Sequence, residues 1–347
     1  MNKNITAIIH ALAAALFYAI NVPCSKLLLE KVAPTFMAAF LYVGAGIGIG
    51  TMYLFHHKDE NPEECLNRKD LPYTLGMILL DIIAPILLMI GVSIGTSSSA
   101  TLLGNFEIVA TTVIALLLFK EKVSRKLWAA IGFITLSSII LSFGDSGQLQ
   151  FSLGSLFVLG ATVCWGLENN CTRSISGKST YQIVIIKGFF SGTGSLIVAL
   201  IIGEKFPDVK YIIPAFLLGF VAYGLSIFTY IRAQKTLGAA KTSAYYAVAP
   251  FIGAFLSFIL LHESLTVSYA IALLVMVIGT ALVVLDTLAH GHAHKHIHTI
   301  THTHDGSCHT HTVTHSHEHN HYISDDRHGH KHSIMELEKL LIGHHNK

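Results

Sequence analysis

The sequence predicts an all-α integral membrane protein with ten transmembrane helices arranged as two inverted five-helix repeats, followed by a disordered His-rich C-terminal tail. Composition is the first observation behind this fold class: apolar residues make up 52% of the 347 residues and charged residues 13%, whereas about a quarter of an average soluble domain is charged. The second is the recurrence of apolar windows. Spanning the bilayer core takes about 20 apolar helical residues, and ten such windows occur before residue 289.

The ten predicted spans follow one another closely along the chain. The first reads ITAIIHALAAALFYAI and follows Lys3. We expect a membrane helix there and not a signal peptide, because nine apolar spans come after it and no small-residue cleavage site leads into a soluble domain. The five cysteines show no spacing typical of a disulfide framework or a closed zinc site. The predicted spans are residues 5–25, 35–55, 72–92, 98–119, 126–143, 152–171, 181–203, 211–232, 242–261 and 267–288.

Lys and Arg in the short connections predict the orientation. Cytoplasmic connections carry the excess of these residues, so both termini are predicted to be cytoplasmic in the cell membrane, and the tail lies inside the cell. The net charge of +2 gives no reason to expect nucleic-acid binding. With the N-terminus inside, the inner side holds Lys3, Lys58, Arg68, Lys69, Lys120, Lys122, Arg125, Lys126, Arg173, Lys178, Lys235 and Lys241, and the outer side holds Lys26, Lys31, Lys205 and Lys210.

An internal repeat is the third observation. Residues 72–141 align without a gap with residues 214–283, so that FKEKVS matches LHESLT and Glu121 falls on Glu263. With a five-residue adjustment, FYAINVPCSK aligns with CWGLENNCTR. Each half has five spans, an odd number, so the second half is inverted relative to the first, as in transporters whose site lies between the repeats. The predicted domains are residues 1–145, 146–289 and the tail, 290–347.

The repeat and its motifs resemble the drug/metabolite transporter superfamily, specifically its EamA-type members. The residues that carry the resemblance are the fourth and ninth spans, which end in FKE and LHE, and the following spans with Gly132 and Gly279. The resemblance implies a ten-helix bundle that moves small organic solutes through a central cavity lined by spans 1, 3, 4, 6, 8 and 9. The His-rich extension is no part of the family pattern, and no motif names a substrate.

Two carboxylates are candidates for the solute site. Asp81 lies about 13 Å into the third span at 1.5 Å per residue, and Glu107 is at a similar depth in the fourth. Polar groups at membrane depth are costly and mark a pathway by default. Each carboxylate could bind a cationic or hydroxylated solute or exchange a proton. The alternative is a neutral carboxyl that only hydrogen-bonds a neighbouring helix.

Two polar helix ends occupy repeat-related positions. Asn21 lies near the outer end of the first span and Glu168 near the inner end of the sixth, which suits two gates with substrate-binding groups; solvated helix ends are the alternative. Pro23 cannot donate to the carbonyl of Ala19 and should kink the first span.

Aromatic residues could form the wall of a small-molecule pocket, although an interfacial belt or core packing would explain them equally well. Pro250 is predicted to break the ninth span beside them. The aromatic candidates are Tyr18, Trp165, Tyr223, Tyr245 and Tyr246.

Two further features are predicted to have no role in the site. Lys187 should snorkel to the cytoplasmic surface with its charged head in water. The run GAGIGIG in the second span should let helix backbones approach closely; it has no strand or Lys-Ser/Thr ending typical of a nucleotide loop.

The tail is predicted to bind divalent metals. Its H-x-H pattern places imidazoles on the same side of an extended chain, and neutral imidazole suits Zn, Ni, Co or Cu. We expect a loose buffer for several ions and no resident cofactor; a merely solubilising low-complexity tail is the alternative. The candidate ligands are His290, His292, His294, His296, His298, His302, His304, Cys308, His309, His311, His315, His317, His319 and His321.

The sequence therefore favours a secondary transporter, most simply an exporter, of a small organic metabolite or drug, with a lipid bilayer around it and a metal-binding regulatory or buffering tail. One alternative is a divalent metal ion transporter fed by the tail, which would require Asp81, Glu107 and Glu168 to converge. Another is a membrane-anchored metal sensor, although ten spans exceed what an anchor needs. No nucleophile and base pair or metalloenzyme motif is present, so an enzyme is not expected.

Overall fold

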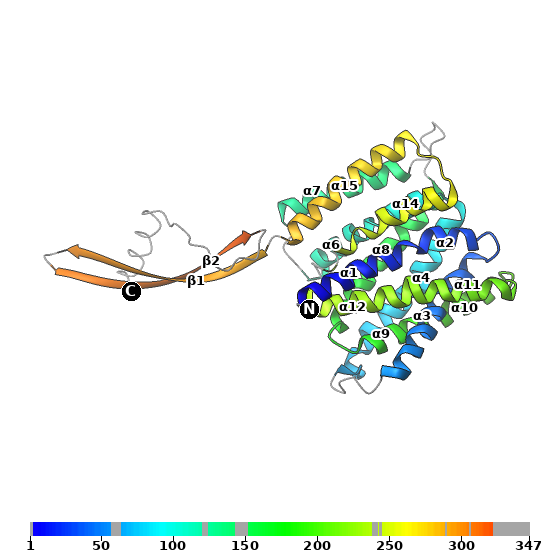
Figure 1. Cartoon of the computed structure of the whole chain (residues 1–347), viewed down its shortest axis with the longest axis horizontal. Helices are drawn as coiled ribbons and strands as arrows, with labels where there is room; N and C mark the ends of the chain where they lie inside the picture. Colours follow the sequence, from blue (N-terminus) through cyan, green and yellow to red (C-terminus); the bar gives the residue numbers. More distant parts are fainter. Residues whose placement is uncertain are drawn as a thin grey trace. The chain divides into compact units, whose positions relative to one another are not determined.

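The computed structural model describes residues 3–56, 64–119, 124–142, 152–237, 242, 245–288, 290–304 and 307–321. The chain divides into two compact units, residues 1–286 and 287–347, and each is described by itself. The first unit is a helical bundle, and the described part of the second is a pair of strands (Figure 1).

The bundle begins with helices that follow one another closely. In its first half these are α1 (Lys3–Ala19), α2 (Asn21–Leu28), α3 (Pro34–His56), the 3-10 turn η3 (Arg68–Asp70), α4 (Leu71–Ile94), α5 (Ser97–Leu103), α6 (Phe106–Phe119) and α7 (Arg125–Ser142). In its second half they are α8 (Leu153–Ile175), α9 (Thr180–Ile186), η4 (Lys187–Ser191), α10 (Gly192–Ile201), α11 (Val209–Gly219), η5 (Phe220–Leu225), α12 (Ser226–Leu237), α14 (Ala249–Leu261) and α15 (Val267–Leu288). The segments η4 and η5 are π-helical and continue the helices on either side.

Seven helical stretches of the described residues are long and apolar enough to cross a membrane. The three other predicted spans differ for identifiable reasons. The fourth is interrupted between α5 and α6, the sixth (α8) ends in a polar run, and the helix of the ninth (α14) has 13 residues. The count of ten crossings therefore stays a prediction. The seven stretches are Asn4–Leu28, Pro34–Phe55, Arg68–Ile94, Arg125–Ser142, Thr180–Ile201, Val209–Leu237 and Val267–Asp286.

Prolines stand at two interruptions of the helices and inside two further helices, α4 and α11. The predicted kink before Pro23 is confirmed, because α1 ends at Ala19 and α2 starts at Asn21. The prediction for Pro250 is also confirmed, since this residue stands in the first turn of α14. Pro85 lies inside α4. It has no N–H to donate to the carbonyl four residues earlier, which is the carbonyl of Asp81.

Glycines of α3 bring this helix very close to the two helical stretches that contain η4 and η5. The predicted packing role of GAGIGIG is confirmed. A Cβ on Gly44 would lie 2.2 Å from the carbonyl oxygen of Phe216, and one on Gly48 would lie 1.9 Å from the ring of Phe220. A Cβ on Gly188, in η4, would lie 2.4 Å from Cα of Gly46. Small residues of this kind permit close helix packing in lipid, where the hydrophobic effect does not drive helices together.

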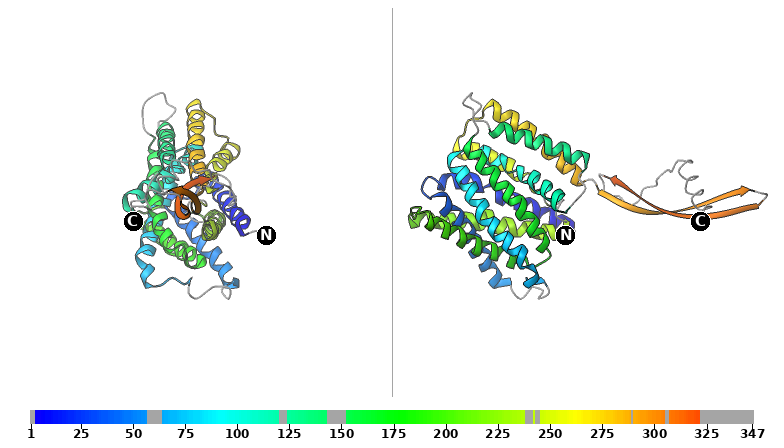
Figure 2. Two further views of the ribbon diagram at one scale, coloured as in Figure 1. Left: turned by 90° about the vertical axis from the view of Figure 1, so that its left-hand side faces the viewer. Right: turned by 180° about the vertical axis from the view of Figure 1, so that it is seen from behind.

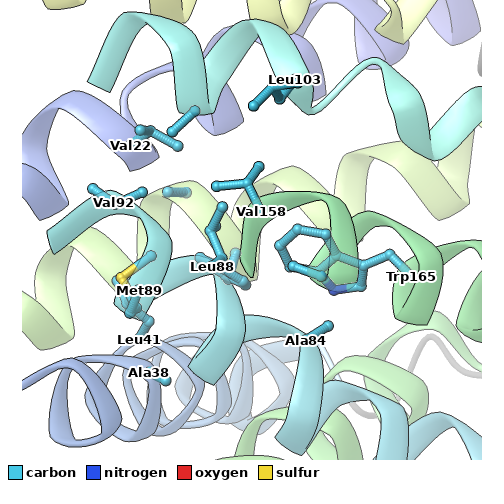
Figure 3. Packing of buried hydrophobic residues seen from close by; sticks show 14 of the residues in the cluster. Val22, Ala38, Leu41, Ala84, Leu88, Met89, Val92, Leu103, Val158 and Trp165 are labelled. Carbon is cyan, nitrogen blue, oxygen red and sulfur yellow. The ribbon is translucent and has the colours of Figure 1, made fainter. Parts of the chain in front are cut away.

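Apolar side chains of α3, α4 and α8 fill one part of the interior. The ring of Trp165 lies among Ala84, Leu88 and Val158 (Figure 3). At the edge of the bundle, α7 and α15 lie side by side (Figures 1 and 2), and the Ser137 hydroxyl donates to the carbonyl of Ala272 at 2.6 Å.

One end of the bundle, here called the first end, contains the connections around residues 29–33, 95–96, 202–208 and 262–266. The Glu204 carboxylate accepts hydrogen bonds from the backbone N–H groups of Thr35 and Phe36, which open α3, at 3.2 and 3.0 Å. The Glu263 carboxylate accepts from those of Ser97 and Ser98, which open α5, at 2.7 and 2.9 Å. Both carboxylates satisfy orphan donors of a helix N-terminus.

Lys26 is the third charged residue whose hydrogen bonds join helices at the first end. Its ammonium donates to the carbonyl oxygens of Val92, Ser93 and Gly95 at 2.7, 3.1 and 2.7 Å. These carbonyls belong to the C-terminal turn of α4, where a cation is favoured by the helix dipole. The side chain therefore joins the end of α2 to the end of α4.

The opposite end, here called the second end, has its own contacts. Lys235 pairs with Glu64 at 2.5 Å and Lys178 with Asp70 at 3.7 Å. The Ser124 hydroxyl donates to the Asp286 carboxylate at 2.7 Å. These contacts join connections that the charge count predicts to lie on one side of the membrane.

The second unit contains the antiparallel strands β1 (His290–His304) and β2 (Ser307–His321). Its backbone register places His292 opposite His319 and His294 opposite His317. The prediction of a disordered tail is therefore not confirmed for these two segments. Thr, Ile and Val occur among the histidines, and β-branched residues favour extended strands. Residues 322–347 lie outside the described part of the chain.

Candidate functional site

A buried ion cluster forms the centre of the candidate site. The Lys187 ammonium, in η4, lies 2.5 Å from Glu168 Oε1 on α8 and 3.2 Å from Asp81 Oδ2 on α4. All three side chains are at most 6% exposed. The prediction that Lys187 snorkels to the surface is wrong. Two carboxylates from other helices face it inside the bundle, so its charge is compensated where it lies.

The position of Lys187 depends on close backbone packing. It is the first residue of η4, and the next residue, Gly188, touches Gly46 of α3. A π-helical turn holds an extra residue and shifts the following side chains around the helix axis; such turns are frequent at functional sites. The second π-helical segment, η5, places Tyr223 on the other side of α3.

Tyrosines connect the ion cluster to the break between α1 and α2. The Tyr42 hydroxyl donates to Asp81 Oδ1 at 2.8 Å, and the rings of Tyr42 and Tyr223 have centroids 4.9 Å apart. Asn21 donates to the Tyr223 hydroxyl at 3.2 Å and accepts from Ser25 at 3.1 Å. A chain of buried polar groups thus runs from α2 to the centre of the bundle.

Glu107 continues the polar region on the other side of α8. It lies in the first turn of α6, and the Asn169 amide donates to its carboxylate at 2.6 Å. The same amide lies 3.3 Å from the Thr111 hydroxyl. Because Asn169 follows Glu168 directly, one turn of α8 takes part both in the ion cluster and in the contact with Glu107.

The aromatic candidates separate into two groups. Tyr18 lies between two others, with ring centroids 6.1 Å from Tyr223 and 5.8 Å from Tyr246. Glu107 is within electrostatic range of the Tyr18 and Tyr246 hydroxyls. Trp165 instead belongs to the apolar core beside Leu88 (Figure 3). Tyr245 is half-buried next to Tyr246, and the ring contacts of the described residues do not include it.

Exposure distinguishes the two sides of the site. The side chains of Asp81, Glu168 and Tyr42 are buried, whereas Glu107, Asn169 and Tyr18 are half-buried. The Glu107 side of the polar region is therefore more exposed than the ion cluster.

The sequence-based reasoning missed four residues of the site. Lys187 was assigned to the surface. Tyr42, Asn169, whose amide donates to Glu107, and Thr172, whose hydroxyl donates to Glu168, were not singled out. One signal was present for Asp81: Pro85 follows four residues later and leaves the Asp81 carbonyl without its helical donor. No comparable signal points to Tyr42, which looks like any aromatic residue of an apolar span.

All candidate metal ligands of the tail lie in β1 and β2, and only their backbone positions are described. Within the described side chains, no group of three or more His, Cys, Asp or Glu residues is placed to hold a metal ion. The central site offers three carboxylates and one ammonium, so its formal charge is negative. Such an arrangement can bind a cation or a hydroxylated molecule and can hold a proton.

Comparison with known proteins decides the family. The model of the EamA-like transporter family matches residues 5–143 and again residues 152–285. The chain belongs to the EamA-like transporter family. An uncharacterized transporter of Methanothermobacter thermautotrophicus is 26% identical over 295 residues, which are 78% of this chain and 84% of that protein. A known crystal structure aligns with a TM-score of 0.62 at 15% identity over 81% of this chain and 96% of the other; this likeness concerns the fold alone.

The family match confirms the predicted resemblance to EamA-type members of the drug/metabolite transporter superfamily. The protein is thus a multi-pass membrane transporter, and its membership argues for transport and against catalysis. Neither the family description nor the relative names a solute.

Proposed function

We propose that this transporter exports a small organic metabolite or drug by alternating access and binds it at the central polar site. The observation that carries the proposal is the convergence of charged, amide and phenol groups from α1, α4, α6, α8, η4 and η5 inside an otherwise apolar bundle. Polar groups cost free energy in such surroundings and mark a transport pathway by default. Aromatic walls with a few placed polar groups are also the usual composition of a small-molecule site.

The solute is proposed to contact the half-buried side of the site. Glu107 supplies a negative charge there, and the Asn169 amide holds its carboxylate at 2.6 Å. The rings of Tyr18 and Tyr246 lie nearby and present π-faces that attract cations. These groups favour a cationic or hydroxylated solute.

Alternating access is proposed to move residues 1–145 against residues 146–289 as inverted repeats. The family model supports this division because it matches once in each half. The contacts at the two ends support the alternating direction of the helices: Glu204, Glu263 and Lys26 join connections of the first end, and Lys235 pairs with Glu64 at the second. Labelling of single cysteines should find residue 146 accessible from outside the cell and residue 124 from inside.

Lys26 is proposed to be part of the outer gate. Three hydrogen bonds tie it to the C-terminal turn of α4, and Asn21, one turn earlier, is tied to Tyr223. Opening the first end by separating α2 from α4 would have to break the contacts of Lys26. The repeat-related position on α8 is Arg173, which has interactions of its own at the second end.

A divalent metal transporter is the competing function. It would require Asp81, Glu107 and Glu168 to face a common ion. Lys187 argues against this arrangement, because its ammonium lies between Asp81 and Glu168 and would repel a second cation. A membrane-anchored metal sensor would leave the buried polar groups of the bundle without a role.

The tail is proposed to buffer or sense metal without passing it through the bundle. The backbone register of β1 and β2 supports metal binding, since it sets His292 opposite His319 and His294 opposite His317. Residues directly opposite on antiparallel strands have Cβ atoms about 4.5–5.5 Å apart. Removal of residues 290–347 should abolish most Zn or Ni binding in isothermal titration and leave solute transport largely unchanged. Because imidazolium cannot bind a metal, binding should also weaken as the pH falls through about 6.5.

The proposal is tested first by finding a solute. A thermal-shift screen of the purified protein against amines, amino acids, nucleobases and divalent metals should reveal ligands, because binding to the folded state raises apparent stability. Glu107→Gln should then insert and fold normally but lose most transport of the identified solute in proteoliposomes. Glu30→Gln makes the same chemical change at an exposed position and is the matched control. Unchanged transport by Glu107→Gln would exclude Glu107 from the pathway, and stabilisation by metals alone would favour the competing function.

A further inference from the structure

The ion cluster carries an uncompensated charge. One ammonium, Lys187, faces two carboxylates, Asp81 and Glu168, so the three groups sum to one negative charge when all are ionised. Each of them is buried and lies on a different helix. Removing a charge from water is costly unless it is paired. The cluster is therefore short of one cation.

The geometry shows where that cation is missing. Lys187 donates its hydrogen bond to Glu168, whose Oε1 also accepts from Thr172. Asp81 Oδ1 accepts from Tyr42. Asp81 Oδ2 has only the electrostatic contact with Lys187 at 3.2 Å and is the one oxygen of this carboxylate without a hydrogen-bond donor, although its side chain is 1% exposed. A buried carboxylate oxygen whose contact is a cation already hydrogen-bonded to another carboxylate calls for an explanation.

Titratable groups on five neighbouring elements bear on the charge of Asp81. Only Lys187 among them is cationic, and the others are acidic or neutral. The titratable groups that act on it are Tyr42 from α3, Lys187 from η4, Glu168 and Cys171 from α8, Glu107 from α6 and Tyr223 from η5.

We propose that Asp81, Glu168 and Lys187 form the binding site for one exchangeable proton, carried on Asp81 Oδ2, which couples transport to proton movement. This inference rests on the proposed transport function and names its coupling ion. A proton from hydronium in the water adds to a lone pair of Oδ2 and forms an O–H bond. Release to water on the other side of the membrane reverses the step, and no electron moves.

A proton fits the site better than a sodium ion. Sodium would need several oxygen ligands, whereas Oδ2 faces the Lys187 ammonium at 3.2 Å, which repels a second cation. A proton neutralises the carboxylate itself and leaves the Lys187–Glu168 pair balanced. Displacement of Lys187 during the transport cycle would change this balance and permit binding or release.

Infrared spectroscopy of the full chain in lipid nanodiscs tests the charge count directly. At neutral pH the wild-type spectrum minus that of Asp81→Asn should contain the C=O band of a protonated carboxyl. Labelling aspartate with 13C at its carboxyl carbon should shift this band, whereas a proton on Glu168 would leave it unshifted and overturn the assignment to Asp81. Absence of any protonated carboxyl from the difference spectrum would overturn the proposal itself.

Substitutions of the partners should change the band in opposite directions. Glu168→Gln leaves one carboxylate facing one ammonium, so the band should disappear. Lys187→Gln leaves two unpaired carboxylates, so a second protonated carboxyl should appear. Lys235→Gln makes the same change in an exposed ion pair and should leave the spectrum unaltered. The spectra are recorded in a buffer whose only added salt is choline chloride. If the wild-type band disappears when sodium chloride replaces it, sodium competes for the site, and the proposal that the ion is a proton is overturned.

The infrared spectrum and the transport assay test separate claims, so one claim can be contradicted while the other stands. The band reports the proton in the resting protein and needs no solute. When a solute from the screen is added to proteoliposomes, wild type should move protons with it, and Asp81→Asn should not. Solute transport by wild type without proton movement would overturn the coupling while leaving the proposed transport function intact.

Discussion

Two ion pairs of this protein have the same length and opposite surroundings. Lys187 and Glu168 lie 2.5 Å apart with side chains 6% and 5% exposed. Lys235 and Glu64 are also 2.5 Å apart, but their side chains are 32% and 43% exposed. Water screens the second pair and already solvates both of its partners. Distance alone therefore says little about what an ion pair contributes.

The buried pair is different because water cannot take the place of a lost partner. Removing one of them leaves a charge in an environment that cannot solvate it, and this is why breaking a buried pair is costly even where the pair itself adds little net stability. The hydrogen-bonded charges at the first end, Lys26 and Glu263, have intermediate surroundings. The loss of unfolding free energy caused by substituting these charged residues should therefore increase with their burial.

The largest effect is expected for Lys187→Met. It keeps the length of the side chain but leaves Asp81 and Glu168 without their cation, and breaking a buried pair costs about 3–5 kcal/mol. The free energy of unfolding in mixed detergent micelles measures this loss. The double variant Lys187→Met with Glu168→Gln should recover part of it, because one unpaired charge is removed. Equal stabilities of the single and double variants would mean that the two residues do not interact.

A smaller loss is expected for Lys26→Met. The substitution removes three charge-assisted hydrogen bonds to Val92, Ser93 and Gly95. Ser93 and Gly95 are half-buried, so water can then solvate their carbonyls, whereas Val92 is buried. Hydrogen bonds to charged groups contribute about 1.5–3 kcal/mol, and we expect a loss of unfolding free energy in that range. A loss no larger than that of Lys235→Met would show that water replaces the ammonium without cost.

Glu263→Gln should come third. The amide retains one acceptor for the N-terminus of α5 and loses the other, together with the negative charge that favours this end of a helix. The loss of a helix cap costs about 0.5–2 kcal/mol. Glu204→Gln makes the same change at α3 and should give a similar decrease in unfolding free energy. A large difference between them would indicate that one carboxylate has a role besides capping.

The smallest effect is expected for Lys235→Met. Exposed ion pairs contribute about 0–1 kcal/mol, and added salt should remove even this difference because it screens exposed charges. Unfolding measured at low and high salt tests both points. A loss comparable to that of Lys187→Met would contradict the ranking by burial.

The sequence by itself determined that the protein is a helical membrane protein and indicated its family. Apolar windows, the repeat and the FKE and LHE motifs depend on local composition and spacing, which are readable along the chain. Depth along a span was also readable, so Asp81 and Glu107 could be singled out. The breaks before Pro23 and Pro250 were predictable because proline removes a backbone donor wherever it occurs.

Only the tertiary structure decided which of these groups meet. Lys187 is buried because Asp81 and Glu168, from distant parts of the chain, face it, and a single lysine in an apolar span reads the same whether it has such partners or reaches the surface. Tyr42 contacts Asp81, whereas Trp165 packs in the apolar core. Each residue advances a helix by about 100°, so the extra residue of a π-helical turn redirects the side chains that follow. That rotation and the packing of α3 against η4 depend on contacts between helices, which no local pattern encodes.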